Sequence, residues 1–264
     1  MQTLTDKLVA NKDNGIGWIT FNNPARHNAV SLEMWQALPV ILAHYHADPE
    51  VRVVILKGAG EKTFVSGADI SQFKEKRSSP EAIQVYNGAS EAASTALREF
   101  SKPTIAMIRG YCIGGGTATA LNCDIRIAAD NARFGVPAGK LGLGYRFGGI
   151  QRLSAVVGPA FAAEIFFTAR QFDAQEALQM GLVNRVVAVG DLDRFTVEYA
   201  NTIAGNAPLT IAAVKRALIE TLKDPAQRDL ARCDAMVDAC FRSADYQEGQ
   251  LAFMEKRKPV FHGR

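Results

Sequence analysis

The stretch TIAMIRGYCIGGG, residues 104–116, decides the fold class. Its first five residues, Thr104–Ile108, are apolar or β-branched, as expected for a parallel strand that is buried on both faces. Three glycines, Gly114–Gly116, then open a short helix that we predict to run through Leu121. A strand that leads through a glycine loop into a helix is typical of α/β proteins, in which parallel strands alternate with helices.

The same strand-to-helix pattern occurs on both sides of this stretch. Upstream, the apolar run Val51–Leu56 predicts a buried strand, residues 58–67 a loop, and residues 80–100 a long helix. Downstream, residues 124–128 predict another strand. The sequence therefore predicts an α/β body with a largely parallel sheet.

The N-terminal segment predicts a hairpin followed by a helix. Two alternating stretches, residues 4–11 and 16–21, flank Asp13-Asn14-Gly15, which is a turn sequence. Ser31 is a good N-cap for an amphipathic helix to about Ala47.

Beyond Gly148 the pattern is almost entirely helical. We expect helices at about 149–157, 159–168, 173–180, 191–205, 208–223 and 225–241, with a short extended piece at Val183–Val187. We therefore predict an α/β core over residues 1–205 and a helical C-terminal segment over residues 206–264, joined near Asn206-Ala207-Pro208.

Composition argues against several classes of function. The 264 residues are 48% hydrophobic and carry a formal charge of +3, which is too small to indicate nucleic-acid binding. The four cysteines have no C-x-x-C spacing, so we expect no metal site and no disulfide framework. The first residues show no secretory signal, and Arg109 interrupts the most apolar stretch, so we expect no membrane span and a cytoplasmic protein.

Two glycine-bearing loops are the best candidates for a site. Residues 64–70, FVSGADI, and residues 110–116, GYCIGGG, each follow a predicted buried strand. Glycines that open a helix leave backbone N–H groups free to stabilise a developing oxyanion. The alternative is that these glycines only permit a tight turn and close packing. A dinucleotide fingerprint at residues 142–147 is excluded because Phe147 stands where the last glycine belongs.

A series of short motifs, taken in order, extends over nearly the whole chain. They are Asn23-Pro24, Asn28-Ala29-Val30, the 64–70 loop, Lys102-Pro103 leading to Gly110-Tyr111, Gly114–Gly116, Cys123-Asp124-Ile125-Arg126, Gly148–Leu153, Ala177–Val183 and Phe253–Pro259. In this order and spacing the chain resembles the crotonase superfamily, also called the enoyl-CoA hydratase/isomerase family.

The resemblance implies a fold, an assembly and a site. The fold would be a spiral of ββα units with a helical C-terminal trimerisation region, assembled as a homotrimer or a dimer of trimers. The oxyanion hole would consist of the N–H groups of Ala68 and Gly115. Ala68, Asp69, Ile70 and Ser71 would line the coenzyme A site, with Arg26 near the phosphates and with Phe253 and Lys256 reaching the site of a neighbouring subunit. The resemblance implies no cofactor other than coenzyme A as part of an acyl-CoA substrate.

The chain departs from the hydratase pattern at two positions. Hydratases of this family carry two glutamates, and the matching positions here are Ala118 and Ala138. Alanine cannot transfer a proton, so efficient hydration of an enoyl thioester would lack its general acid and base.

The pattern around Tyr145 looks most like the methylmalonyl-CoA decarboxylase branch, in which a tyrosine at this position lies beside the substrate carboxylate. Our first hypothesis is therefore decarboxylation of a short malonyl-type thioester. The second is a hydratase or isomerase with Asp69, Asp124 or Tyr145 as acid/base. The third is an acyl-CoA-binding protein without turnover.

Overall fold

The computed structural model describes residues 5–69 and 80–264, which form two β-sheets and the helices around them. The six-stranded sheet has the order β1-β2-β3-β5-β7-β10, and the four-stranded sheet has the order β4-β6-β8-β9. The strands are β1 (Leu8–Asp13), β2 (Ile16–Phe21), β3 (Val53–Gly58), β4 (Thr63–Val65), β5 (Thr104–Ile108), β6 (Tyr111–Ile113), β7 (Ile125–Ala129), β8 (Arg133–Gly135), β9 (Phe172–Asp173) and β10 (Arg185–Val187). Only the pairs β1–β2 and β8–β9 are antiparallel among the paired strands of the described chain.

Among the described α-helices, those up to α7 each follow one or two strands, whereas α8, α9 and α10 follow one another without a strand between them. The α-helices are α1 (Leu32–Ala47), α3 (Pro80–Arg98), α4 (Gly115–Asn122), α5 (Phe147–Thr168), α6 (Ala174–Gln179), α7 (Leu192–Ala204), α8 (Pro208–Thr221), α9 (Leu230–Phe241) and α10 (Ala244–Met254). Short 3-10 helices are η1 (Pro24–Arg26), η3 (Pro137–Leu141), η4 (Val189–Asp191) and η5 (Pro225–Gln227).

The chain winds as a spiral of ββα turns. The pairs β3–β4, β5–β6 and β7–β8 each give their first strand to the large sheet and their second strand to the small one. A helix, α3, α4 or α5, follows each pair. The α/β class with a spiral of ββα units is therefore confirmed.

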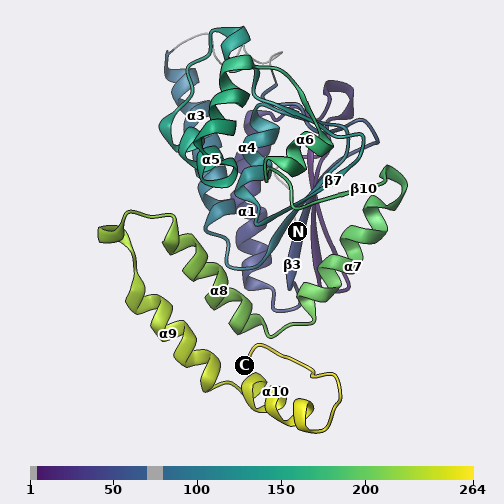
Figure 1. Ribbon diagram of the computed structural model, residues 1–264, viewed down its shortest axis with the longest axis vertical. Helices are drawn as coiled ribbons and strands as arrows, with labels where there is room; N and C mark the ends of the chain where they lie inside the picture. The colour runs from purple at the N-terminus through teal and green to yellow at the C-terminus, as the bar shows by residue number, and fades with distance from the viewer. Residues whose placement is uncertain (1–4, 70–79) are drawn as a thin grey trace.

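The large sheet separates two apolar clusters. Leu56, Ala106 and Ala128 point into the main core with α1 and α3, whereas Ile55 and Met107 point into a smaller cluster under α7. Figure 1 shows α1 and α3 on one side of the strands and α7 on the other. Because both faces are covered, these strands are apolar at nearly every position, which is the signal that identified them in the sequence.

The turn and strand predictions were accurate where the local signal was strong. Residues Asn14 and Gly15 adopt positive φ values of 48° and 80° in the predicted hairpin, and the predicted strand Thr104–Ile108 matches β5. The interpretation of residues 58–67 as a loop was wrong in part, because β4 lies within it. The small sheet and α10 were not predicted.

The predicted helices 149–157 and 159–168 form α5, which is kinked at Gly158, where φ is 75° and Pro159 follows. By length and composition α5 is the one helix in the described chain that could cross a membrane. The kink divides it into two halves, each well short of the ~20 residues that a span needs.

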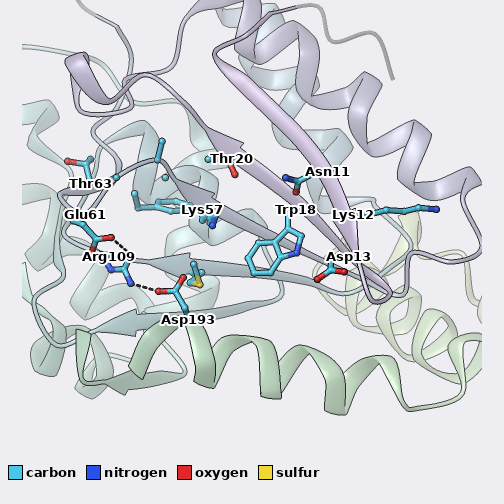
Figure 2. Close-up of a pocket in the computed structure, with 15 residues that line it drawn as sticks. Asn11, Lys12, Asp13, Trp18, Thr20, Lys57, Glu61, Thr63, Arg109 and Asp193 are labelled. Carbon is cyan, nitrogen blue, oxygen red and sulfur yellow. Dashed lines mark hydrogen bonds and ion pairs between the residues drawn. The ribbon is translucent and has the colours of Figure 1, made fainter. Parts of the chain in front are cut away.

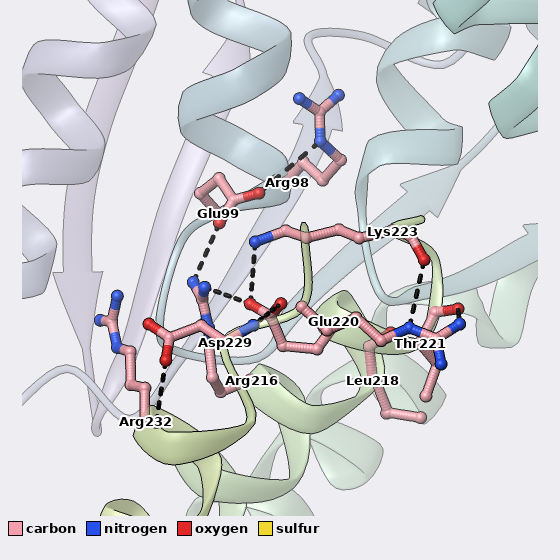
Figure 3. Close-up of polar contacts among 10 residues, drawn as sticks. Arg98, Glu99, Arg216, Leu218, Glu220, Thr221, Lys223, Asp229 and Arg232 are labelled. Carbon is pink, nitrogen blue, oxygen red and sulfur yellow. Dashed lines mark hydrogen bonds and ion pairs between the residues drawn. The ribbon is translucent and has the colours of Figure 1, made fainter. Parts of the chain in front are cut away.

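The C-terminal helices extend from the body but remain anchored to it (Figure 1). The buried Lys215 of α8 donates to the Lys102 carbonyl at 2.7 Å and to Asp124 at 2.8 Å. Figure 3 shows the second anchor, in which Arg216 binds Glu99, which directly follows α3, and also pairs with the buried Glu220. Two ion pairs, Lys215–Asp124 and Arg216–Glu99, thus join α8 to the core.

Candidate active site

The two glycine-bearing loops meet at the N-terminus of α4. Strands β4 and β6, which lead into them, pair in parallel. A Cβ atom added to Gly115 would lie 3.4 Å from the Gly67 Cα and 3.7 Å from the Ala68 nitrogen. The backbones of Ala68 and Gly115 are therefore neighbours, with no side chain between them.

The N–H groups of Ala68 and Gly115 are not used in the backbone hydrogen bonds of the bridge and the helix to which these residues belong. An isolated parallel bridge joins Val30 to Ala68 and uses the N–H groups of Val30, at 2.8 Å from the Gly67 oxygen, and of Asp69, at 3.1 Å from the Val30 oxygen. In such a bridge the N–H of the middle residue, Ala68, faces away from the partner. Gly115 is the first residue of α4, where an N–H has no partner within the helix. Two adjacent free donors at a helix N-terminus can hold an oxyanion.

Close packing holds the two loops in this arrangement. A Cβ on Gly116 would lie 2.0 Å from the Val65 carbonyl oxygen, so only glycine fits there. Gly67 has a φ of 112°, a conformation that other residues rarely adopt. The Gly135 carbonyl accepts the Gly114 N–H at 2.8 Å and the Thr117 hydroxyl at 3.2 Å, which ties β8 to the start of α4.

The two alanine positions lie on the segments that this tie connects. Ala118 is half-buried in the first turn of α4, and Ala138 is buried in η3, three residues beyond Gly135. Ala138 belongs to the main apolar core, against which Tyr145 also packs. Neither alanine supplies a proton or a charge to this region.

Tyr145 follows Ala138 by seven residues along the chain. Its ring contacts Phe166 edge to face, with centroids 4.8 Å apart, and a Cβ on Gly149 would lie 2.6 Å from its Cε1 atom. Burial raises the pKa of Tyr145, so the hydroxyl remains protonated at neutral pH and can donate a hydrogen bond. Among the described residues no acceptor for this hydroxyl is found.

Asp69 and Asp124 are the two carboxylates that the sequence offers as alternative acids or bases. Asp124 accepts the Thr104 N–H at 2.7 Å and the Thr104 hydroxyl at 2.8 Å, and it pairs with Lys215. It therefore braces the start of two strands, which leaves it poorly suited to proton transfer. Asp69 is buried directly after Ala68, and its own N–H closes the bridge to Val30.

The expected coenzyme A residues fall into three groups. Arg26 is exposed at the end of η1, and its carbonyl lies 3.5 Å from the Ser66 hydroxyl, beside the loop that carries Ala68. Ile70 and Ser71 lie outside the described residues.

Phe253 and Lys256 form the third group, at the far end of the molecule. Phe253 is 86% exposed on α10, and the exposed Lys256 follows this helix with a φ of 55°. Figure 1 places α10 well away from α4 and α5. Within one chain these two residues do not reach the loops of Ala68 and Gly115.

Sequence reasoning missed the residues that position the Ala68 loop. The Tyr86 hydroxyl donates to the Val30 carbonyl at 2.9 Å and accepts the Trp35 Nε1–H at 2.9 Å. Asn28 donates from its side chain to the carbonyls of Ala59 and Thr63 at 3.0 and 2.7 Å. Asn28 stood in a quoted motif, but nothing in the sequence linked Tyr86 to the site.

Comparison with known proteins identifies the class of this arrangement. The profile of the enoyl-CoA hydratase/isomerase family matches residues 11–264. The chain belongs to this family, and it is a crotonase-fold enzyme that acts on acyl-CoA thioesters.

Individual relatives and solved structures are similar to this chain over nearly its whole length. The chain is 37% identical over 253 residues to a short-chain-enoyl-CoA hydratase of Clostridium acetobutylicum, with 96% of each chain covered. It is 35% identical over 265 residues to a carnitinyl-CoA dehydratase of Escherichia coli strain K12, covering 99% of this chain and all of that one. The structure of an enoyl-CoA hydratase/carnithine racemase from Magnetospirillum magneticum is similar with a TM-score of 0.91 at 38% identity, over 98% of this chain and 97% of that one. These names support the family, and they do not single out the decarboxylase branch.

Proposed function

We propose that this enzyme decarboxylates a short malonyl-type thioester, such as methylmalonyl-CoA or ethylmalonyl-CoA. The observation that carries the proposal is the pair Ala118 and Ala138, which stand where hydratases resembling this chain carry their catalytic glutamates. The groups that remain available for catalysis are two adjacent backbone N–H donors, at Ala68 and Gly115, in apolar surroundings. This set suits a reaction that needs an enolate to be stabilised but no base to create it.

The reaction can be written with the residues present. The bond between Cα and the substrate carboxylate breaks, CO₂ leaves, and the electron pair moves through Cα to the thioester oxygen. The N–H groups of Ala68 and Gly115 stabilise the resulting enolate oxygen, and one such donor contributes about 3 kcal/mol in enzymes of known mechanism. Water then returns a proton to Cα.

The neutral surroundings favour loss of the carboxylate. A glutamate at Ala118 or Ala138 would repel the substrate carboxylate. Alanine instead leaves an apolar wall, which destabilises the charged carboxylate of the bound substrate. This charge moves away from the wall in the transition state as CO₂ leaves, so the barrier is lowered. The protonated Tyr145 hydroxyl would orient the carboxylate by donating one hydrogen bond to it.

A second candidate is hydration or dehydration of an enoyl-CoA or a hydroxyacyl-CoA. It is favoured by the names of the relatives at 37% and 35% identity. The acid and base would then have to come from Asp69 or Tyr145, because Asp124 is held by Thr104 and Lys215.

A panel of thioesters separates the candidates. Purified enzyme is incubated with malonyl-, methylmalonyl-, ethylmalonyl- and crotonyl-CoA, and products are followed by mass spectrometry. Decarboxylation predicts loss of CO₂ from a malonyl-type substrate and negligible water addition to crotonyl-CoA. Hydration of crotonyl-CoA at rates usual for the family would refute the proposal. Tight binding without any product would instead support an acyl-CoA-binding protein.

The coenzyme A site is proposed to be completed by a second copy of the chain. Phe253 and Lys256 are exposed and remote from Ala68, and an apolar groove lies between α8, α9 and α10. We propose a homotrimer or a dimer of trimers, in which these residues contact the coenzyme A of the adjacent subunit. We also propose that the enzyme is located in the cytoplasm.

A further inference from the structure

A second cavity lies on the face of the large sheet that α7 covers. It has a volume of about 570 Å³ and is lined by Phe64 of the first glycine-bearing loop, but by neither Ala68 nor Gly115. Figure 2 shows Trp18, Lys57 and Arg109 gathered around it, with α7 beneath.

The strand register explains why this part of the sheet is polar. Thr20 on β2 is the partner of Lys57 on β3, which in turn is the partner of Met107 on β5. This row lies at the carboxyl ends of the parallel strands, the edge at which α/β proteins commonly bind ligands. On the same face the preceding row, with Ile55 and Ile105, is buried under α7.

The cations around the cavity differ in how they are compensated. Arg109 is paired with Glu61 and Asp193, although its buried Nε–H has no hydrogen-bond partner among the described residues. Lys12 pairs with Asp48 and Glu50 and points away from the cavity (Figure 2).

Lys57 is half-buried and has no carboxylate partner in the described chain. Its contact is with the ring of Trp18, with the ammonium 4.9 Å from the ring centroid. The carboxylate of Asp13 also lines the cavity, but at its exposed rim. A half-buried ammonium without a carboxylate partner favours a ligand that brings negatively charged acceptors.

We propose that this cavity is a second ligand site, which binds a small organic anion through Lys57, with Arg109 and Thr20 as further donors and Trp18 as its wall. The anion carries a carboxylate or a phosphate group. The cavity also adjoins the roots of both oxyanion loops, because Thr63 begins β4 and Arg109 immediately precedes Gly110 and β6.

The test uses the full-length enzyme and two probes, inorganic phosphate and succinate. Each is titrated at constant ionic strength, balanced with sodium chloride, and binding is followed by calorimetry and by tryptophan fluorescence. Of the two tryptophans, Trp35 is buried and bonded to Tyr86, so the fluorescence change should come from Trp18 and disappear in Trp18→Phe. Tighter binding of phosphate or of succinate tells which anionic group the site prefers.

The decisive variant is Lys57→Gln, with Lys62→Gln as its control. Lys62 is exposed, belongs to the adjoining loop and does not line the cavity. We expect saturable binding that weakens at least about tenfold in Lys57→Gln, as for loss of a charge-assisted contact, and that is retained in Lys57→Arg and Lys62→Gln. Circular dichroism establishes that each variant is folded.

Saturating coenzyme A should leave this binding unchanged, because it would occupy the other site. The proposal is overturned if neither probe binds saturably, if sodium chloride alone gives the same signal, or if Lys57→Gln binds like the unmodified enzyme. Displacement of the probe by coenzyme A would also overturn it. None of these outcomes depends on which reaction the enzyme catalyses.

Discussion

Two regions of the molecule use different chemical groups. One is the N-terminus of α4, and the other is the junction between the end of α3 and α8. At α4 the groups that we propose to be functional are backbone amides, held by glycines and surrounded by alanine and aromatic side chains. At α8 they are side-chain charges, with Arg216, Glu220 and Lys223 in one network (Figure 3). Fixed dipoles do not titrate, whereas ion pairs do. Chemistry at α4 should therefore be insensitive to pH in the range where the attachment of α8 is sensitive to it.

The largest expected effect comes from Gly116→Ala, which attacks the backbone geometry directly. The new Cβ would lie 2.0 Å from the Val65 oxygen, so β4 and α4 must separate. We expect turnover to fall at least about a hundredfold and stability to fall by about 1–3 kcal/mol. Steady-state kinetics and thermal melting measure the two effects.

Gly88→Ala is the matched control for this variant. Gly88 is exposed in α3 with nothing within 4 Å of an added Cβ, so alanine should stabilise the helix slightly. If Gly116→Ala turned over substrate as well as Gly88→Ala, the oxyanion assignment would be wrong.

The next effect comes from placing a charge where the α4 site has none. Ala118→Glu should slow decarboxylation about ten- to a hundredfold, because a second negative charge repels the substrate carboxylate. Ala118→Gln has the same size without the charge and should lose much less. Equal losses in both variants would indicate a steric effect and would remove the argument from neutrality. The double variant with Ala138→Glu is the one in which weak hydration of crotonyl-CoA should be sought.

Tyr145→Phe should have a smaller effect on turnover, about tenfold, because it removes one orienting hydrogen bond and leaves the oxyanion donors intact. Burial raises the pKa of Tyr145 in the folded enzyme. The stability that follows from this shift is complete below the unfolded pKa of about 10 and is lost as pH rises through the folded value. Kinetic profiles up to pH 10 should therefore be flat for the unmodified enzyme. An ionisation near neutral pH that Tyr145→Phe abolishes would contradict this role.

Glu220→Gln tests how much the charged network of α8 contributes to stability. A hydrogen bond from Lys223 is the main cause that lowers the pKa of Glu220, followed by the Asp229 N–H. A carboxylate with a lowered folded pKa stabilises above its unfolded value of 4.5, and this stabilisation is lost as pH falls through the folded pKa. At pH 7 the melting temperature of the unmodified enzyme should be higher than that of Glu220→Gln. The difference between the two melting temperatures should become smaller at acidic pH. Glu198→Gln, which removes only an exposed pair with Arg194, is the control, and a similar gap for both would refute the role of Glu220.

The smallest effect is expected from Lys256→Ala. Lys256 is exposed and would contact a phosphate of coenzyme A on an adjacent subunit. Its loss should raise KM several-fold and leave kcat nearly unchanged, since no reacting atom is touched. Kinetics combined with sedimentation analysis tests this, because full activity of a strictly monomeric enzyme would exclude the arrangement.

The parts of this structure that could be predicted from the sequence are those with a local signal. β5 and the start of α4 follow from five residues that are apolar or β-branched and from three glycines, and the first hairpin follows from Asn14 and Gly15. The small sheet has strands of two or three residues, too short to show a period, so β4 was hidden within a predicted loop. Tyr86 and Val30 are 56 positions apart, and their hydrogen bond depends on how α3 packs.

The substitution of Ala118 and Ala138 within an intact glycine framework has a consequence for how such an enzyme can diversify. An oxyanion hole made of main-chain amides is encoded by no particular side chain, so most point mutations cannot delete it. Only positions such as Gly116, where a Cβ meets the Val65 oxygen, are closed to change. The side chains at Ala118, Ala138 and Tyr145 can be exchanged around it, so that one enolate-forming scaffold can pass between reactions through a small number of point mutations.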